Sequence, residues 1–462
     1  MPLSRREAIG SLLGLLSGGV FTRVFGSGIE TRWRVATFRA EVTPPMGHPL
    51  MGGGIAPAQT VVDPLFVHGL VLLGPDNPIV LASVDWCEIR NEAYTRWREV
   101  LAEAAGTIPE RVLVTCIHQH DAPVADLEAE RLLEASGAKG RVCDLSFHEE
   151  AVQRAAGALR DGLPKARRMT HYGTGQAKVE QVASNRRYLG PDGKPAFARM
   201  SATKDAYARE QAEGTIDPVL KTLSFWDGDR PLVALSGYAV HPMSYYGRGG
   251  VSADFIGMAR SARQAETPET FQMYASGCSG NVVAGKYNDG AEENRPALAK
   301  RMHDAMKAAW GVTQRKALDQ LAFRTTPLRL EPRSDKGFSV EELEGRMKHD
   351  LLPFGQCLAA LGLSWRKRAD AGHKLDVPAV DFGGAQLLLF PAEAYVEFQL
   401  AAQEARPDSF VLVMGYGECA PGYIPIDRAF EEGDTNLTDW CWVAPGSEGR
   451  MREAIGKVLR LS

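Results

Sequence analysis

The sequence predicts an α/β fold, in which a mixed β-sheet core is flanked by helices within one large domain. Apolar runs of strand length alternate with segments of helical periodicity along most of the chain. Neither an internal repeat nor a clear linker divides the region after residue 32. At 462 residues and 44% hydrophobic content, the chain is long enough to bury a large core.

The first part of the chain carries four strand-like runs and two helix-like segments. The strands are expected at 33–42, 65–73, 79–84 and 111–118. Pro44 and Pro45 end the first of them, because proline cannot continue a paired strand. Periodic apolar residues predict helices over 91–105 and 147–161.

The second part begins with a polar, turn-rich segment at 184–215, which we expect to be a loop or lid. A hairpin follows, because two apolar runs flank the turn Asp227-Gly228-Asp229. The remaining elements are strands at 385–390 and 410–414, and helices at 292–310, 339–363 (one or two helices) and 393–405.

Composition excludes several classes of protein. The 53 Lys and Arg against 57 Asp and Glu, a net charge of −4, argue against a nucleic-acid partner, which favours a basic protein. The chain has no apolar run of the roughly 20 residues that cross a membrane. Seven cysteines are too few for a disulfide scaffold.

Residues 1–30 have the layout of an export signal. Arg5 and Arg6 precede a short apolar stretch that contains glycines, and paired arginines resemble a twin-arginine signal. We therefore expect a periplasmic or extracellular protein. No clear small-x-small cleavage site follows, so one alternative is an uncleaved signal that keeps the protein at a membrane surface. Another alternative is that these residues form an amphipathic first helix of the domain. Export would permit a disulfide, for which Cys419 and Cys441 are the first pair to consider.

Four polar clusters follow apolar runs, and the first contains His118 and His120. On a regular strand, residues i and i+2 share a face, so the two imidazoles would point together. Such a pair suits metal binding or acid/base work, although many pairs of this kind are incidental. Cys116 would share the face, and we interpret it as a small buried apolar residue.

The other clusters end in His241, Glu393 and Tyr423. Each has an ordinary interpretation when taken alone. His241 precedes a proline and could be a core histidine, Glu393 could begin a helix, and Tyr423 could pack in a glycine- and proline-containing turn.

Together the clusters resemble the catalytic domain of the neutral ceramidase family, over about residues 34–435. His118-Gln119-His120-Asp121-Ala122-Pro123 corresponds to the family's His-x-His-Ser-Gly-Pro. The strand end Ala239-Val240-His241-Pro242, the sequence Pro391-Ala392-Glu393 and the loop Gly422-Tyr423-Ile424 correspond to its later motifs.

The resemblance implies a zinc hydrolase domain over 33–462, with Zn²⁺ held by His118, His241, Glu393 and Tyr423. His120 would then act as an acid/base beside the metal, and Tyr423 or a neighbouring donor would support the oxyanion. Asp85 and Asp254 are expected either to accept from the imidazole N–H groups or to be ordinary turn and cap aspartates.

The chain departs from the family at Val283, where ceramidases carry a serine that has been assigned a nucleophilic or substrate-binding role; Ser276 or Ser279 is a candidate replacement. We also expect the family's C-terminal immunoglobulin-like domain to be absent. The leading hypothesis is hydrolysis of a linear amide in a small N-acylated or lipid-like substrate by metal-activated water. Hydrolysis of an ester or sugar-derived substrate, and a non-catalytic binding protein, remain alternatives.

Overall fold

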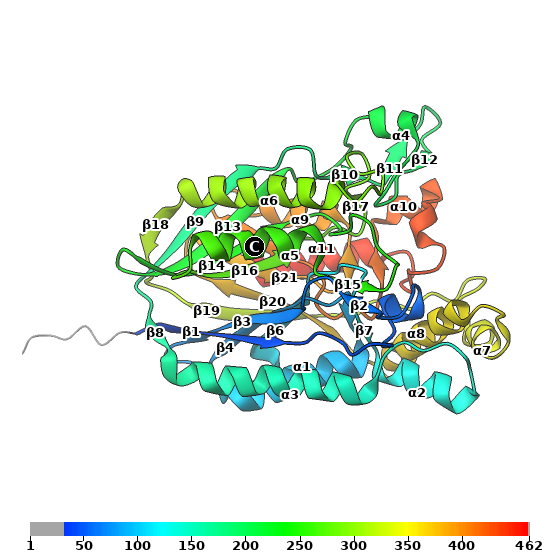
Figure 1. The fold of residues 1–462 in the computed structure, drawn as a ribbon, viewed down its shortest axis with the longest axis horizontal. Helices are drawn as coiled ribbons and strands as arrows, with labels where there is room; N and C mark the ends of the chain where they lie inside the picture. Colours follow the sequence, from blue (N-terminus) through cyan, green and yellow to red (C-terminus); the bar gives the residue numbers. More distant parts are fainter. Residues whose placement is uncertain (1–31, 461–462) are drawn as a thin grey trace, which may run out of the picture. The chain divides into compact units, whose positions relative to one another are not determined.

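A computed structural model describes residues 32–460, which form one compact unit of mixed α/β architecture (Figure 1), and the predicted fold class is confirmed. The export signal predicted for residues 1–30 lies outside the described residues and stays a prediction. Within residues 32–460, every helix is too short or too polar to span a lipid bilayer.

The first sheet has the strand order β6-β4-β3-β1-β8. Its strands are β1 (Arg34–Glu41), β3 (Phe66–Leu73), β4 (Ile79–Val84), β6 (Val112–Cys116) and β8 (Arg167–Arg168). β4 and β6 are parallel, and the other neighbours are antiparallel. Helices α1 (Asn91–Ala105) and α3 (Leu145–Gly162) cover one face, at the bottom of Figure 1.

The second sheet has the order β16-β14-β13-β9-β18. It consists of β9 (His171–Lys178), β13 (Val219–Asp227), β14 (Arg230–Tyr238), β16 (Phe271–Ser276) and β18 (Gln314–Ala317). The predicted hairpin is confirmed as β13 and β14, and β14 runs parallel to β16. Helices α5 (Asp254–Glu266) and α6 (Asn294–Gly311) pack on this sheet.

A third sheet has the order β19-β20-β21-β23. Its strands are β19 (Ala322–Leu328), β20 (Leu375–Asp381), β21 (Ala385–Leu389) and β23 (Phe410–Met414), and β21 and β23 are parallel. Apolar side chains from all three sheets form a shared core, which includes Leu70, Leu235 and Leu387. Burial of such side chains is the main driving force for assembling the sheets.

The described chain also contains seven further α-helices and ten short strands. The helices are α2 (Leu127–Ser136), α4 (Ala206–Glu210), α7 (Val340–His349), α8 (Pro353–Asp370), α9 (Val396–Glu404), α10 (Asp427–Glu432) and α11 (Ser447–Leu459). The short strands are β2 (Thr60–Val61), β5 (Glu88–Ile89), β7 (Val124–Ala125), β10 (Ser184–Asn185), β11 (Arg187–Leu189), β12 (Pro195–Ala198), β15 (Gly250–Val251), β17 (Val282–Val283), β22 (Glu393–Ala394) and β24 (Tyr423–Ile424).

Three expectations need correction. The segment 184–215 is not a plain loop, since it contains β10, the β11–β12 hairpin and α4. The helix expected from residue 393 begins at Val396, and Glu393 belongs to β22. All seven cysteines are free and buried, so Cys419 and Cys441 are not joined.

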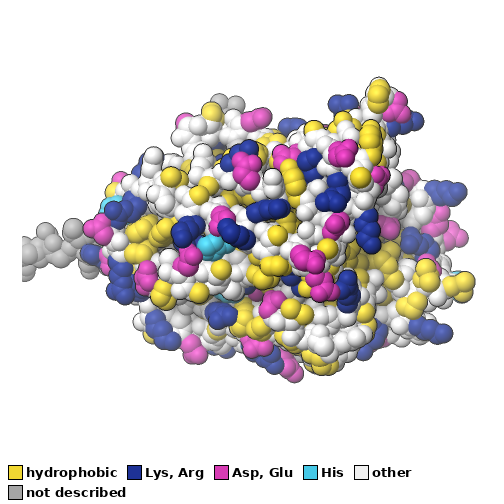
Figure 2. Space-filling model, turned by 45° about the horizontal axis from the view of Figure 1, so that its top comes forward, with side chains coloured by type: hydrophobic (Ala, Val, Ile, Leu, Met, Phe, Trp, Pro, Cys, Tyr) yellow, Lys and Arg dark blue, Asp and Glu magenta, His cyan; other side chains and the backbone are white. Residues whose placement is uncertain are grey.

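The surface shows no field of a single sign on the face in Figure 2, where acidic and basic side chains are interspersed. This distribution agrees with the nearly balanced composition.

The buried histidine His148, on α3, should make the protein sensitive to acid. Burial lowers the pKa of His148 to about 4, against roughly 6.5 in an unfolded chain. Between these values the unfolded state binds a proton that the folded state does not, so stability falls as the pH falls. From pH 7 to pH 5 the loss from this group should be about 2 kcal/mol. Urea unfolding at both pH values measures it.

In His148→Gln the loss of stability between pH 7 and pH 5 should shrink by about that amount, because glutamine does not titrate. His349→Gln, at an exposed position on α7, is the matched control and should behave like the native protein. Equal acid sensitivity of the native protein and His148→Gln would contradict the prediction.

Candidate metal centre

The candidate site lies beyond the carboxyl ends of strands from all three sheets. His118 and His120 follow β6, His241 follows β14, and Glu393 follows β21. In sheets with parallel strands, ligands bind outside the carboxyl ends, where loops can converge without interrupting the sheet. The three sheets therefore bring together side chains that lie far apart in the sequence.

Three of the predicted ligands meet at one point. The Oε2 atom of Glu393 lies 2.9 Å from Nε2 of His241 and 3.2 Å from Nε2 of His118. Candidate ligand atoms of the three residues all lie within 4.8 Å of one another. The side chains are buried, with His118 2%, His241 0% and Glu393 1% exposed.

Backbone carbonyls determine which imidazole nitrogen carries the proton. Nδ1 of His118 lies 2.9 Å from the Cys87 carbonyl, and Nδ1 of His241 lies 2.6 Å from the Ser279 carbonyl. A carbonyl can only accept, so each Nδ1 donates and each neutral ring presents the lone pair of Nε2. In the neutral rings, two nitrogen lone pairs and a carboxylate oxygen therefore face one another, an arrangement that a bound cation would stabilise.

The electrostatics of this group favour a charged carboxylate. Burial opposes ionisation of Glu393, but the neighbouring His118 and His241 hold the pKa of its carboxyl well below the usual range. Burial likewise opposes protonation of His118, yet the charge of Glu393 raises the pKa of that imidazole. Two imidazoles and one carboxylate form a set typical of catalytic zinc, so the residues fit that metal.

A second grouping, Cys87 with His118 and His120, is less suited to a metal. Candidate ligand atoms of these residues also lie within 4.8 Å of one another. However, burial raises the pKa of the Cys87 thiol well above its usual range, so the thiolate that binds metals is disfavoured. Nδ1 of His118, the nitrogen nearest to Cys87, is also engaged by the carbonyl.

Tyr423 reaches the same cavity through a short parallel pairing. Strands β22 and β24 place Glu393 directly beside Tyr423. The phenol oxygen of Tyr423 accepts a hydrogen bond of 2.6 Å from Nη1 of Arg186. Burial raises the pKa of Tyr423, so the phenol stays protonated at neutral pH.

Arg186 is a candidate residue that the sequence analysis missed. Its side chain is buried, and Nη1 also donates to Oδ1 of Asn436 at 3.1 Å. No carboxylate among the described residues lies within ion-pair distance of it. The polar segment 184–215 indicated only a lid, and nothing in its pattern distinguished Arg186 from its neighbours.

His120 lies beside the three converging ligands without joining them. Its ring centroid is 5.5 Å from that of His118 and 4.9 Å from that of Tyr246. Burial and the two neighbouring histidines lower the pKa of His120 well below its usual value, which favours a neutral imidazole. Nδ1 has no hydrogen-bond partner among the described residues.

His118 and His120 lie close together for a different reason than the one predicted from the sequence. Strand β6 ends at Cys116, and His118 has a φ of 69°, which a regular strand does not permit. Ala392 and Tyr416, both at 55°, also occupy the left-handed region next to the site. Such strain in residues other than glycine costs about 1–3 kcal/mol each and is typical of functional sites.

The two aspartates expected beside the imidazoles contact other groups. Asp85 forms a two-pronged ion pair with Arg260, at 2.6 and 2.7 Å. Asp254 accepts from the Ser244 hydroxyl at 2.7 Å and lies 3.3 Å from Arg295. The expectation that they accept from the ring N–H groups is therefore wrong, because backbone carbonyls occupy those positions.

Ser276 and Ser279, which were considered as replacements for the ceramidase serine that is Val283 here, do not line the cavity. The Ser276 hydroxyl donates to the Ile117 carbonyl at 2.7 Å, and Ser279 is hydrogen-bonded to the Tyr416 phenol, also at 2.7 Å. Val283 itself is buried in β17, which pairs with β10. Neither serine is placed as a nucleophile.

A cavity of about 300 Å³ opens over the candidate ligands, at the small end of the range for small-molecule sites. Its apolar lining residues are Met51, Met200, Met243, Phe354 and Trp440. Its polar lining residues include Arg186, Thr435, Asn436, Thr438 and Asp439. A substrate with an apolar and a polar part would match this mixed lining.

The fold and the site together define a mixed α/β domain with a buried His–His–Glu centre at the carboxyl ends of its strands. No protein-family model matches the sequence, and no curated protein matches it significantly. Solved structures are similar in fold. A neutral ceramidase from Pseudomonas aeruginosa aligns with a TM-score of 0.67 and 16% identity over 94% of this chain and 75% of its own.

A structure described as ceramidase complexed with C2 aligns with a TM-score of 0.70 and 17% identity, over 94% of this chain and 76% of its own. At these identities the likeness concerns the fold, which is that of the ceramidases.

Proposed function

We propose that the protein is a zinc-dependent hydrolase that cleaves a linear amide bond in an N-acylated substrate. The observation that supports it best is the convergence of two imidazole lone pairs on the buried carboxylate of Glu393. The ceramidase-like fold favours an amide over an ester as the bond attacked, although fold alone does not determine function.

His118, His241 and Glu393 would hold the zinc, with the Tyr423 phenol beside them. Zinc in such a site lowers the pKa of a bound water and polarises a carbonyl group. His120, being neutral and having a free Nδ1, would take a proton at that atom and return it to the leaving amine.

Arg186 and Tyr423 would act on the carbonyl oxygen. The Arg186 guanidinium has no carboxylate partner among the described residues, and it already donates to the Tyr423 phenol. Donors fixed in this way stabilise the negative charge that develops on an acyl oxygen, and each is worth about 10²–10³-fold in rate. No serine is required, in agreement with the absence of Ser276 and Ser279 from the cavity lining.

The test combines metal analysis with a substrate panel. Purified protein should contain about one equivalent of zinc, as one four-coordinate site predicts, and should hydrolyse acyl amides in preference to esters and glycosides. His118→Ala should lose both zinc and activity. His373→Ala, which removes a histidine paired with Glu418 outside the cavity, should keep both.

Zinc well below one equivalent in the native protein, with no further loss in His118→Ala, would contradict the proposal. Preferential cleavage of esters or glycosides would agree with the zinc site but would show that the bond cleaved is not an amide. Bound zinc without turnover of any member of the panel would favour a binding protein.

A further inference from the structure

A second, larger cavity of about 670 Å³ lies where the first and second sheets meet α5. Four basic side chains line it, and we call it the basic cavity: Arg39 on β1, His68 on β3, Arg167 on β8 and Arg260 on α5. It shares no lining residue with the cavity of the candidate metal centre.

Strand register explains why two of these side chains, Arg39 and His68, meet. Arg39 and His68 are directly opposed in the antiparallel pair of β1 and β3, so they project from the same face of the sheet. Two residues along β3, Leu70 projects from that face into the apolar core between the sheets. Along this face the side chains therefore change from the buried, apolar Leu70 to the nearly buried His68 and the exposed Arg39.

The positive charge of the basic cavity is only partly neutralised. Arg260 is paired with Asp85 through both carboxylate oxygens. Arg39 lies over the Phe66 ring at 3.5 Å, and no carboxylate among residues 32–460 lies within ion-pair distance of Arg39 or Arg167. Glu269 also lines the cavity, but it forms no ion pair with these arginines.

Two buried polar atoms of the basic cavity have no partner among the described residues. Nδ1 of His68 is one of them, and the side chain is only 7% exposed. Nη2 of Arg167 is the other. Burial, with the charges of Arg260 and Arg39, lowers the pKa of His68 well below its usual value, so the ring is neutral and offers one N–H.

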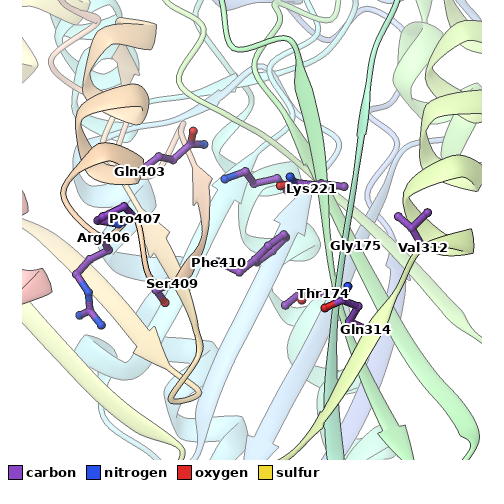
Figure 3. A pocket seen from close by; sticks show the side chains of 11 residues that line it. Thr174, Gly175, Lys221, Val312, Gln314, Gln403, Arg406, Pro407, Ser409 and Phe410 are labelled. Atoms are coloured by element: carbon purple, nitrogen blue, oxygen red, sulfur yellow. The ribbon is translucent and has the colours of Figure 1, made fainter.

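Another surface cavity, of about 490 Å³, shows that basic lining residues alone are not unusual in this chain (Figure 3). It contains Lys221 and Arg406, but both are engaged. Lys221 donates to the Val411 carbonyl at 3.0 Å, and Arg406 contacts Asp408 and the Leu459 carbonyl. The basic cavity differs because two of its buried polar atoms, Nδ1 of His68 and Nη2 of Arg167, have no partner among the described residues, and because the exposed Arg39 has no carboxylate partner there.

We propose that the basic cavity binds a phosphate-type oxyanion, with Arg39 and Arg167 as the main donors and His68 as a third. Guanidinium groups match the tetrahedral oxyanion through paired N–H donors. Leu232 and Phe271 line the same cavity and offer an apolar surface to an organic group attached to the phosphate. The site is independent of the proposed hydrolase activity.

Calorimetric titration of the full-length protein with inorganic phosphate and with glycerol 1-phosphate tests the proposal. Saturable binding should weaken by at least about tenfold, or roughly 1.4 kcal/mol, in Arg39→Ala and in Arg167→Ala. Arg39→Lys should lose less, because it keeps the charge. Arg34→Ala is the control, since Arg34 is exposed on the same strand, five residues away, and projects from the opposite face.

Sedimentation with vesicles that contain phosphatidic acid distinguishes the source of the phosphate. Vesicle binding that is lost in Arg39→Ala, without binding of the soluble phosphates, would assign a lipid headgroup. No saturable binding of either kind, or binding that is equal in the native protein and both alanine variants, would overturn the proposal. Hydrolase activity is not the readout, so this result and that of the zinc test are separate.

Discussion

Replacing Glu393 by Gln should remove the zinc and lower kcat/KM by more than the roughly 10²–10³-fold that loss of one oxyanion donor costs. Its carboxylate is the only negative charge in the group formed with His118 and His241. An amide oxygen is a weaker ligand, and the amide N–H can donate to the Nε2 lone pairs that otherwise face a cation. Metal analysis and steady-state kinetics measure the two losses.

The variant should also reveal whether a cation belongs at this point. Added zinc should raise the melting temperature of the native protein, because a ligand that binds only the folded state stabilises it. It should not raise that of Glu393→Gln. Glu130→Gln is the control, because Glu130 is equally buried, at 1% exposure, and lies outside the cavity. Native zinc content in Glu393→Gln would contradict the assignment.

Replacing His120 by Gln should leave the zinc in place and lower kcat by about 10²–10⁴-fold, the usual contribution of a general acid/base. The reason is the position of His120 beside the converging ligands, with no hydrogen bond to Glu393 among the described contacts. Because the proton transfer belongs to the transition state, KM should change little. Steady-state kinetics and metal analysis of the same preparation measure these effects.

This variant also separates the two groupings of candidate ligands. If His120→Gln lost its zinc, the metal would belong to the group of Cys87, His118 and His120. His303→Gln, at a half-buried position of α6 beside Glu266, provides the matched control and should keep both zinc and rate.

Elements with sharply bounded apolar runs could be predicted from the sequence. The strand expected at 79–84 and the helix expected at 91–105 have those bounds in the structure. Strand β9 was missed, because it is polar and contains Gly173 and Gly175. Glycine is needed at position 175, where an added Cβ would overlap the Ala309 carbonyl of α6. The glycine that the close packing of α6 on β9 requires therefore made this strand hard to recognise in the sequence.

The candidate ligands could be located because the resemblance to the ceramidase family singled out residues near the ends of apolar runs. The hydrogen-bond partners of these residues could not be located from the sequence. Arg186 lies in a segment of short strands without an apolar run, and the carbonyls of Cys87 and Ser279 leave no trace in side-chain identity. Hydrogen bonds to the backbone depend on how the three sheets pack, which no local pattern encodes.

The left-handed conformations of His118, Ala392 and Tyr416 have a consequence for engineering. Glycine at position 392 would relieve an unfavourable conformation worth about 1–2 kcal/mol. A laboratory selection for heat resistance alone would favour Ala392→Gly. The same substitution would make the backbone next to Glu393 more flexible and its side chain less precisely positioned. Stability and catalytic activity therefore make opposite demands on this position. A screen that scores only survival after heating would enrich variants that are stable but inactive.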